Sequence, residues 1–64
     1  MTAPVKKGDR LVVYGRPEVA IVVDVVPLPN EARTAYTLDW GAFGLSRVYD
    51  TDEGKVWNRY ASLN

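Results

Sequence analysis

The sequence predicts one small all-β domain of five strands, and three features of the chain support this. Its 64 residues leave room for a single hydrophobic core and no second domain. Glycine, proline, asparagine and aspartate cluster at intervals of roughly ten residues, which is the spacing of turns in a small sandwich or barrel. The segments between them are rich in β-branched and aromatic residues, which favour pleated strands. We therefore expect a five-stranded barrel that spans residues 1–64.

The first half of the chain predicts two strands and a proline loop. Residues 7–9 form an opening turn and residues 10–14 the first strand, which ends at 15–18 because glycine and proline are poor in strand interiors. Residues 19–26 form the second strand, since their valine-rich run is short and too β-branched for a buried helix. Two prolines remove backbone donors from residues 27–31, so this segment is predicted to be a loop.

The second half of the chain predicts three more strands. Aromatic and aliphatic side chains alternate with polar ones over residues 33–40, which is the period of a half-buried strand. A glycine-containing turn at 41–44 leads to a strand at 45–49, and an acidic turn at 50–54 leads to the last strand at 55–60. The final four residues suit a single 3₁₀ turn.

Side-chain parity defines the faces of the last hairpin. With residues 50–54 as its loop, Arg47 pairs with Trp57, because antiparallel partners lie directly opposite each other. Val48 and Val56 then face the core. Beside Leu45, the outward face carries the candidate binding residues Arg47, Tyr49, Lys55, Trp57 and Arg59.

The preceding hairpin needs one extra residue. A plain four-residue loop would place Leu38 on the outward face, which contradicts the burial expected of leucine. A β-bulge near Gly41 or Gly44 returns Leu38 to the core face, and glycine suits a bulge because it adopts positive φ. The same shift brings Tyr36 and Trp40 to the core face. We therefore expect a bulge at one of these glycines.

Asp24 interrupts the apolar second strand on the face that also carries Val22 and Val26. An unpaired carboxylate buried there would cost on the order of several kcal/mol. We therefore expect this face to be exposed. Val22 and Val26 then become exposed apolar groups beside a charge, which indicates a partner or a second copy of the chain.

Composition narrows the classes of function. The chain has no Cys and no His, which removes disulfides, thiolate chemistry and the commonest transition-metal ligands. Eight basic and eight acidic residues give zero net charge, which argues against affinity built on phosphate neutralisation. No Gly-x-Ser-x-Gly elbow and no phosphate-binding glycine loop occurs. We therefore expect a chain that is not an enzyme by itself and has no cofactor.

The acidic turn is the remaining candidate for a metal site. Asp50, Asp52 and Glu53 supply oxygen ligands of the kind that Ca²⁺ prefers. Their spacing does not complete an EF-hand loop, which also needs a distal glutamate. We therefore expect a solvated turn and no metal.

The chain shows no targeting signal. Its first residues lack the apolar run of a signal peptide, and no stretch approaches the ~20 apolar residues of a membrane span. We therefore expect a cytoplasmic protein without membrane contact. A hydrophobic content of 47% exceeds what a very small barrel encloses, which favours a homo-oligomer.

The two ends of the chain resemble SH3-like barrels of the Tudor and KOW type. Such domains often begin with a Gly-Asp turn like the one in Lys6-Lys7-Gly8-Asp9-Arg10-Leu11-Val12, and residues 56–63 are similar to their last strand and 3₁₀ turn. The Ala-Leu-Tyr-Asp-Tyr segment with which signalling SH3 domains bind proline-rich peptides is absent. The resemblance implies an SH3-like barrel.

The predicted outward face of the last hairpin leaves three interpretations open. Its arginines and lysine interleave with aromatic rings, a combination that contacts protein partners at binding hot spots or stacks on the bases of a nucleic acid. Alternatively, the arginines pack on Trp57 within the domain. We expect a non-catalytic binding or adaptor module whose partner is a protein. The alternatives are a nucleic-acid-binding module, or an oligomeric enzyme whose site forms between chains.

Overall fold

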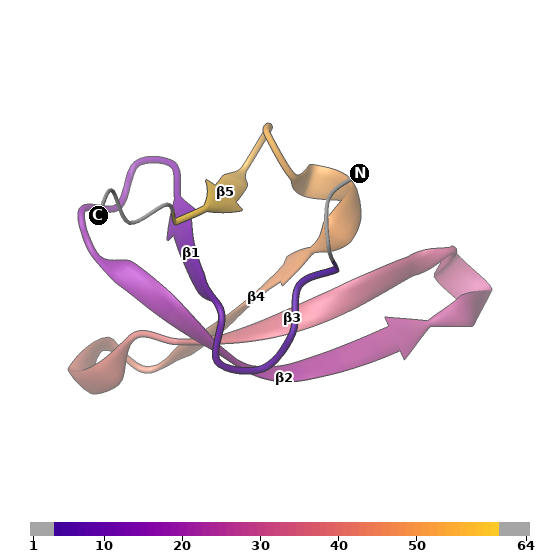
Figure 1. Cartoon of the computed structure of the whole chain (residues 1–64), viewed down its shortest axis with the longest axis horizontal. Coiled ribbons are helices and arrows are strands. Elements are labelled where there is room, and N and C mark those ends of the chain that lie inside the picture. The colour runs from indigo at the N-terminus through magenta and orange to yellow at the C-terminus, as the bar shows by residue number, and fades with distance from the viewer. Residues whose placement is uncertain (1–3, 61–64) are drawn as a thin grey trace.

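The fold is described over residues 4–60 in this computed structural model and consists of strands joined by short turns (Figure 1). In order, the elements are β1 (Arg10–Val13), β2 (Val19–Leu28), η1 (Pro29–Glu31), β3 (Arg33–Asp39), η2 (Gly41–Phe43), β4 (Leu45–Tyr49), η3 (Asp50–Asp52) and β5 (Trp57–Arg59), where η marks a 3₁₀ helix. All strand pairs are antiparallel, and the order across the sheet is β4-β3-β2-β1-β5.

This architecture confirms the predicted all-β class with five strands. The hydrogen-bonded sheet is open, because its two ends, β4 and β5, are not paired with each other. The predicted 3₁₀ turn at 61–64 lies outside the described residues. Within residues 4–60 no helix has the length and apolar character needed to cross a membrane.

Strand β2 is longer than the sequence predicts and contains a proline. It runs through Pro27 to Leu28, so the predicted loop shrinks to η1. Pro27 lies opposite Thr34, and because it has no N–H, it fits a strand where its nitrogen faces away from the paired neighbour. The chain then reverses at Ala32, whose φ of 54° is left-handed. β2 and β3 form a long ribbon that projects beyond the other strands (Figure 1).

A β-bulge in β2 places Asp24 outside the core. Val22 lies opposite Leu38, whereas Asp24 lies opposite Thr37, so Val23 is the extra residue of β2. The bulge changes the side-chain parity of the strand after it. Val22 is buried and Asp24 is exposed. The prediction that these two residues share an exposed face is therefore wrong.

The turn between β3 and β4 produces the predicted parity in a different way. Tyr36 lies opposite Val48, and both side chains are buried in the core. The connection spans residues 40–44 and is closed by a 2.8 Å hydrogen bond from the Trp40 N–H to the Gly44 carbonyl. Gly41 and Gly44 have φ values of 68° and 92°. The extra residue therefore belongs to the turn itself, and the β3–β4 ladder contains no bulge.

The last strand pairs with β1, so the predicted hairpin between residues 45–49 and 55–60 is wrong. Val13 lies opposite Trp57, and Val12 lies opposite Asn58. After η3 the chain makes a tight turn in which the Val56 N–H donates to the Asp52 carbonyl at 2.9 Å. This turn carries the chain away from β4 and shortens the last strand to Trp57–Arg59.

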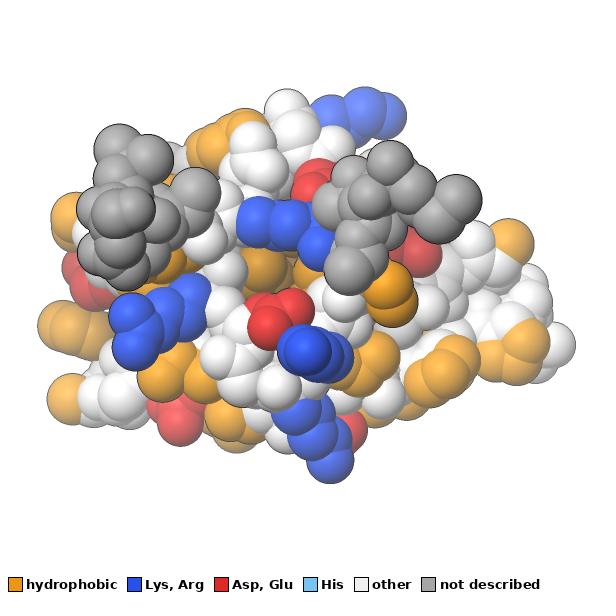
Figure 2. All heavy atoms as spheres, in the orientation of Figure 1, with side chains coloured by type: hydrophobic (Ala, Val, Ile, Leu, Met, Phe, Trp, Pro, Cys, Tyr) orange, Lys and Arg blue, Asp and Glu red, His pale blue; other side chains and the backbone are white. Residues whose placement is uncertain are grey.

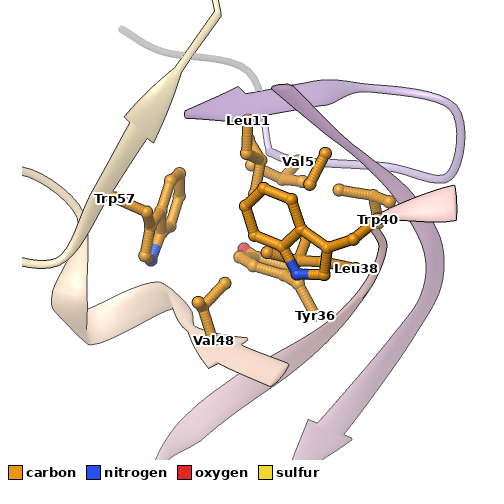
Figure 3. Close-up of a cluster of buried hydrophobic side chains, with 9 residues drawn as sticks. Val5, Leu11, Tyr36, Leu38, Trp40, Val48 and Trp57 are labelled. Atoms are coloured by element: carbon orange, nitrogen blue, oxygen red, sulfur yellow. The ribbon is translucent and has the colours of Figure 1, made fainter. Parts of the chain in front are cut away.

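The core lies on one face of the sheet and centres on two aromatic rings (Figure 3). Tyr36 and Trp57 meet edge to face, with ring centroids 5.7 Å apart. Trp57 is fully buried, whereas Val56 is 41% exposed, so the prediction that Val56 faces the core and Trp57 faces solvent is wrong by one residue. The core cluster comprises Val5, Leu11, Ala20, Val22, Tyr36, Leu38, Trp40, Val48 and Trp57.

Candidate binding surface

The predicted binding face of the last hairpin is not formed as one surface. Trp57 lies in the core, where its Nε1 donates a 2.7 Å hydrogen bond to the carbonyl of Tyr49. Lys55 is exposed in the turn before β5, at the other end of the sheet order from β4. Arg47 is exposed on β4, opposite Thr37 of β3. The two strands that were expected to bring these residues together are not neighbours.

The remaining two predicted residues are engaged within the domain. The ring of half-buried Tyr49 is covered by the guanidinium of Arg33, which lies 3.7 Å from the ring centroid. Arg59 donates from Nε to a carboxylate oxygen of Glu53 at 2.9 Å. Cation–π packing therefore does occur in the domain. In this contact the cation is Arg33 and the ring is Tyr49, whereas the sequence predicts arginines packed on Trp57.

The acidic turn serves the fold. Asp50 Oδ1 accepts a 3.0 Å hydrogen bond from the Thr34 N–H, which continues the β3–β4 pairing by one side chain. Glu53 holds Arg59. In the part of the chain that the structure describes, no three acidic side chains gather into a group that could hold a metal ion. Burial raises the pKa of the neighbouring Tyr36 phenol, and the carboxylate of Asp50 raises this pKa further.

The sheet face opposite the core carries exposed apolar side chains and is the strongest candidate for a binding surface. Leu45, Asp39, Ile21 and Arg10 lie opposite one another in register across neighbouring strands. Leu45 is 68% exposed and Ile21 is 45% exposed. We call this surface the outer face, and define it by Arg10, Val19, Ile21, Thr37, Asp39, Leu45 and Arg47.

Two open hollows lie on the outer face. One has a volume of about 220 Å³ and is lined by Arg10, Val19, Ile21 and Tyr60. The other has a volume of about 300 Å³ and is lined by Thr37, Leu45, Ser46 and Arg47. Each hollow combines exposed apolar groups with one arginine, which is the mixture that protein interfaces favour.

Part of this surface is predicted by the sequence. Leu45 and Arg47 were placed on an outward face, and the structure agrees for both. Strict alternation from an exposed Asp24 places Ile21 on the opposite, inward face, and this is wrong because the bulge at Val23 changes the parity between Val22 and Asp24. The small side chain of Ala20, which is fully buried opposite Leu11, is a signal that could have identified the inward face.

Charge is dispersed over the molecule. Figure 2 shows Lys and Arg side chains on the visible face as separate groups, with acidic and apolar groups between them. This agrees with the zero net charge of the chain. No protein-family model matches the sequence, and no curated protein and no solved structure matches it either.

Proposed function

We propose that this chain is a small non-catalytic binding module that presents the outer face of its sheet to a protein partner. The observation that carries the proposal is the exposure of Leu45 and Ile21, at 68% and 45%, on one sheet face beside Arg47 and Arg10. Large aliphatic side chains next to arginines suit a contact that excludes water at its centre and is polar at its rim.

The proposed fold family is the SH3-like barrel. Two observations support this proposal. The last strand pairs with the first, and the Trp57 indole on β5 donates a 2.7 Å hydrogen bond to the carbonyl of Tyr49 at the end of β4. In such a barrel the first and last strands of the chain pair with each other. The two strands at the ends of the sheet order are then brought close together, which closes the barrel. The opening turn at Gly8 and Asp9, where the Gly8 N–H donates to the Val22 carbonyl, fits the same family.

A protein partner is favoured over a nucleic acid by charge and shape. Non-specific nucleic-acid affinity comes from the release of counterions by clustered lysines and arginines. The outer face has two arginines, Arg10 and Arg47, and an acidic residue, Asp39, lies between their strands in register. Tyr60 is the one aromatic residue among those that line the two hollows, whereas a surface that binds single strands stacks successive bases on several rings.

A photo-crosslinking experiment tests this proposal. A photoreactive phenylalanine analogue is placed at position 21 or 45, and at position 30 in the exposed turn η1 as the control. Irradiation in the producing cells, followed by nuclease treatment and mass spectrometry, should identify the same partner protein at positions 21 and 45 and not at position 30. Adducts that are equal at all three positions would contradict the proposal, and adducts to nucleic acid would replace it with the nucleic-acid alternative.

A further inference from the structure

The strands of this sheet have three edges without a neighbouring strand among the described residues. They are the far edge of β4, the far edge of β5, and the part of β2 after Val22, where pairing with β1 and its preceding turn ends. An unpaired edge presents backbone N–H and C=O groups that another strand can bind, and proteins commonly block such edges. The three edges differ in how far their donors are already occupied.

The edge of β2 offers no free donor. After the bulge, Pro27 must direct its nitrogen away from β3, and Val25, two residues earlier, faces the same way. Pro27 has no N–H, and the N–H of Val25 donates to Asp24 Oδ1 at 2.9 Å. Asp24 therefore blocks the edge with its own carboxylate, which explains a charged residue within an otherwise apolar strand.

The edge of β5 is blocked in the same manner. The N–H of Arg59 donates to Asn58 Oδ1 at 2.8 Å. The carbonyl of Trp57 accepts a 2.8 Å hydrogen bond from the Gly54 N–H, so the turn before the strand folds back over its edge. A new strand would have to displace both hydrogen bonds.

The edge of β4 is open at two residues. The Trp40 N–H donates to the Gly44 carbonyl, so Gly44 directs its backbone toward β3. Because backbone groups alternate in direction along a strand, Ser46 and Val48 also direct theirs toward β3. Leu45 and Arg47 therefore direct theirs away from the sheet. Within residues 4–60, no side chain and no turn bonds to these backbone groups. The open stretch ends at residue 49, whose carbonyl accepts the Trp57 indole.

The side chains beside this edge describe what would bind there. Arg47 is exposed and forms no ion pair with any residue from 4 to 60. Leu45 is 68% exposed, and the hollow of about 300 Å³ opens between these two side chains and Thr37. Opposite charges and apolar pairs across neighbouring strands are the favourable combinations.

We infer that a partner protein docks by adding an extended segment of its own to the open edge of β4, as a sixth strand of the sheet. In that segment an acidic residue lies opposite Arg47, and an apolar residue two positions away lies opposite Leu45 and reaches into the hollow. The inference rests on the proposed function and names its partner class. A second copy of the chain fits less well, because two-fold pairing of β4 with itself sets Arg47 opposite or diagonal to its own counterpart.

Hydrogen exchange of the free protein tests the edge itself. The amides of Leu45 and Arg47 should exchange at least about tenfold faster than those of Ser46 and Val48, because they have no bond partner. Equal protection of all four amides would show that the edge is already occupied and overturn the inference. Protection of Leu45 and Arg47 that rises with protein concentration would identify a second copy as the occupant and overturn it as well.

Peptide selection tests the occupant. A display library of random twelve-residue peptides is selected on the immobilised chain, and the enriched peptides should share an acidic residue two positions from an apolar one. Arg47→Ala removes the charge alone, whereas Arg47→Pro also removes the edge N–H. The proline variant should bind the selected peptides about tenfold more weakly than the alanine variant, as for the loss of a backbone hydrogen bond.

The outcomes separate this inference from the proposed function. Peptides that bind both Arg47 variants equally but are lost with Ile21→Asp would leave the outer face as a binding surface and overturn strand addition. A selection that enriches no peptide sensitive to any of these variants would contradict both. Thermal unfolding of each variant checks that the fold is intact, and Lys55→Ala is the matched control for loss of a charge away from β4.

Discussion

The indole Nε1 of Trp57 donates a 2.7 Å hydrogen bond to the backbone carbonyl of Tyr49, and this bond joins the two ends of the open sheet. β4 and β5 do not pair, yet a side chain from one reaches the backbone of the other. The same indole packs against the Tyr36 ring in the core, nearly perpendicular to it (Figure 3). One residue therefore fills the core and connects strands that lie at opposite ends of the strand order.

Loss of this indole should be among the most destabilising single changes in the chain. We expect Trp57→Ala to lower the free energy of unfolding by about 3–5 kcal/mol, as for other buried aromatic residues. Trp57→Phe keeps much of the apolar volume but leaves the Tyr49 carbonyl without its donor, at a cost of about 1–3 kcal/mol. Urea unfolding measures both, with Leu45→Ala on the exposed face as the control. A Trp57→Ala cost no larger than that of Leu45→Ala would contradict the burial of Trp57.

Removal of the Asp24 carboxylate should expose a strand edge with little effect on stability. Asp24 is exposed, so Asp24→Ala should change the free energy of unfolding by less than about 1 kcal/mol. The amide of Val25 should exchange faster, and light scattering should show more association at high concentration. Glu18→Ala removes an acidic side chain from the turn before β2 and serves as the control. Unchanged Val25 exchange would mean that Asp24 does not protect this edge.

Stability should fall at alkaline pH through Tyr36. Burial raises the pKa of its phenol, with further elevation from Asp50 against the opposing charge of Arg59. Below about pH 10 the phenol is protonated in both states and has no effect. Above that pH the unfolded chain releases the proton while the folded chain retains it, so the free energy of unfolding decreases as pH rises.

Tyr36→Phe tests this alkaline effect. The variant should show a shallower loss of stability between pH 9.5 and 11.5 than the unaltered chain, when both are unfolded with urea. Tyr60→Phe, which alters an exposed phenol, should retain the original slope. Identical slopes for all three proteins would show that Tyr36 ionises equally readily in both states.

The turn at η1 contains a strained backbone position that glycine should relieve. Ala32 has a φ of 54°, and the left-handed region costs an L-residue with a side chain roughly 1–2 kcal/mol. Part of the relief is offset because glycine has more freedom in the unfolded chain, so Ala32→Gly should stabilise by up to about 1 kcal/mol. Ala42→Gly, in η2 where φ is not positive, should destabilise by about 0.5–1 kcal/mol. Destabilisation by both changes would contradict the left-handed conformation.

The sequence by itself determined the class of the fold and the positions of most strands. Four of the five strands begin at the predicted residue and end within two residues of the prediction, because turns are specified by local residues such as Gly15, Pro29 and Gly44. The parity of Tyr36 and Leu38 relative to Val48 also followed from the sequence, since only one arrangement buries all three. Leu45 and Arg47 were placed outward for the same reason.

The tertiary structure alone decided which strand β5 joins and which of its faces is buried. β5 is short, and its partner depends on contacts with β1 that lie far away in sequence. If the turn before β5 were one residue longer or shorter, Val56 would face the core and Trp57 the solvent, because side chains alternate with a period of two. The bulge at Val23 and the inclusion of Pro27 in β2 were likewise decided only by the tertiary structure. Local propensity selects extended backbone, whereas only the packed sheet determines which backbone groups are paired and which, as on β4, are left open.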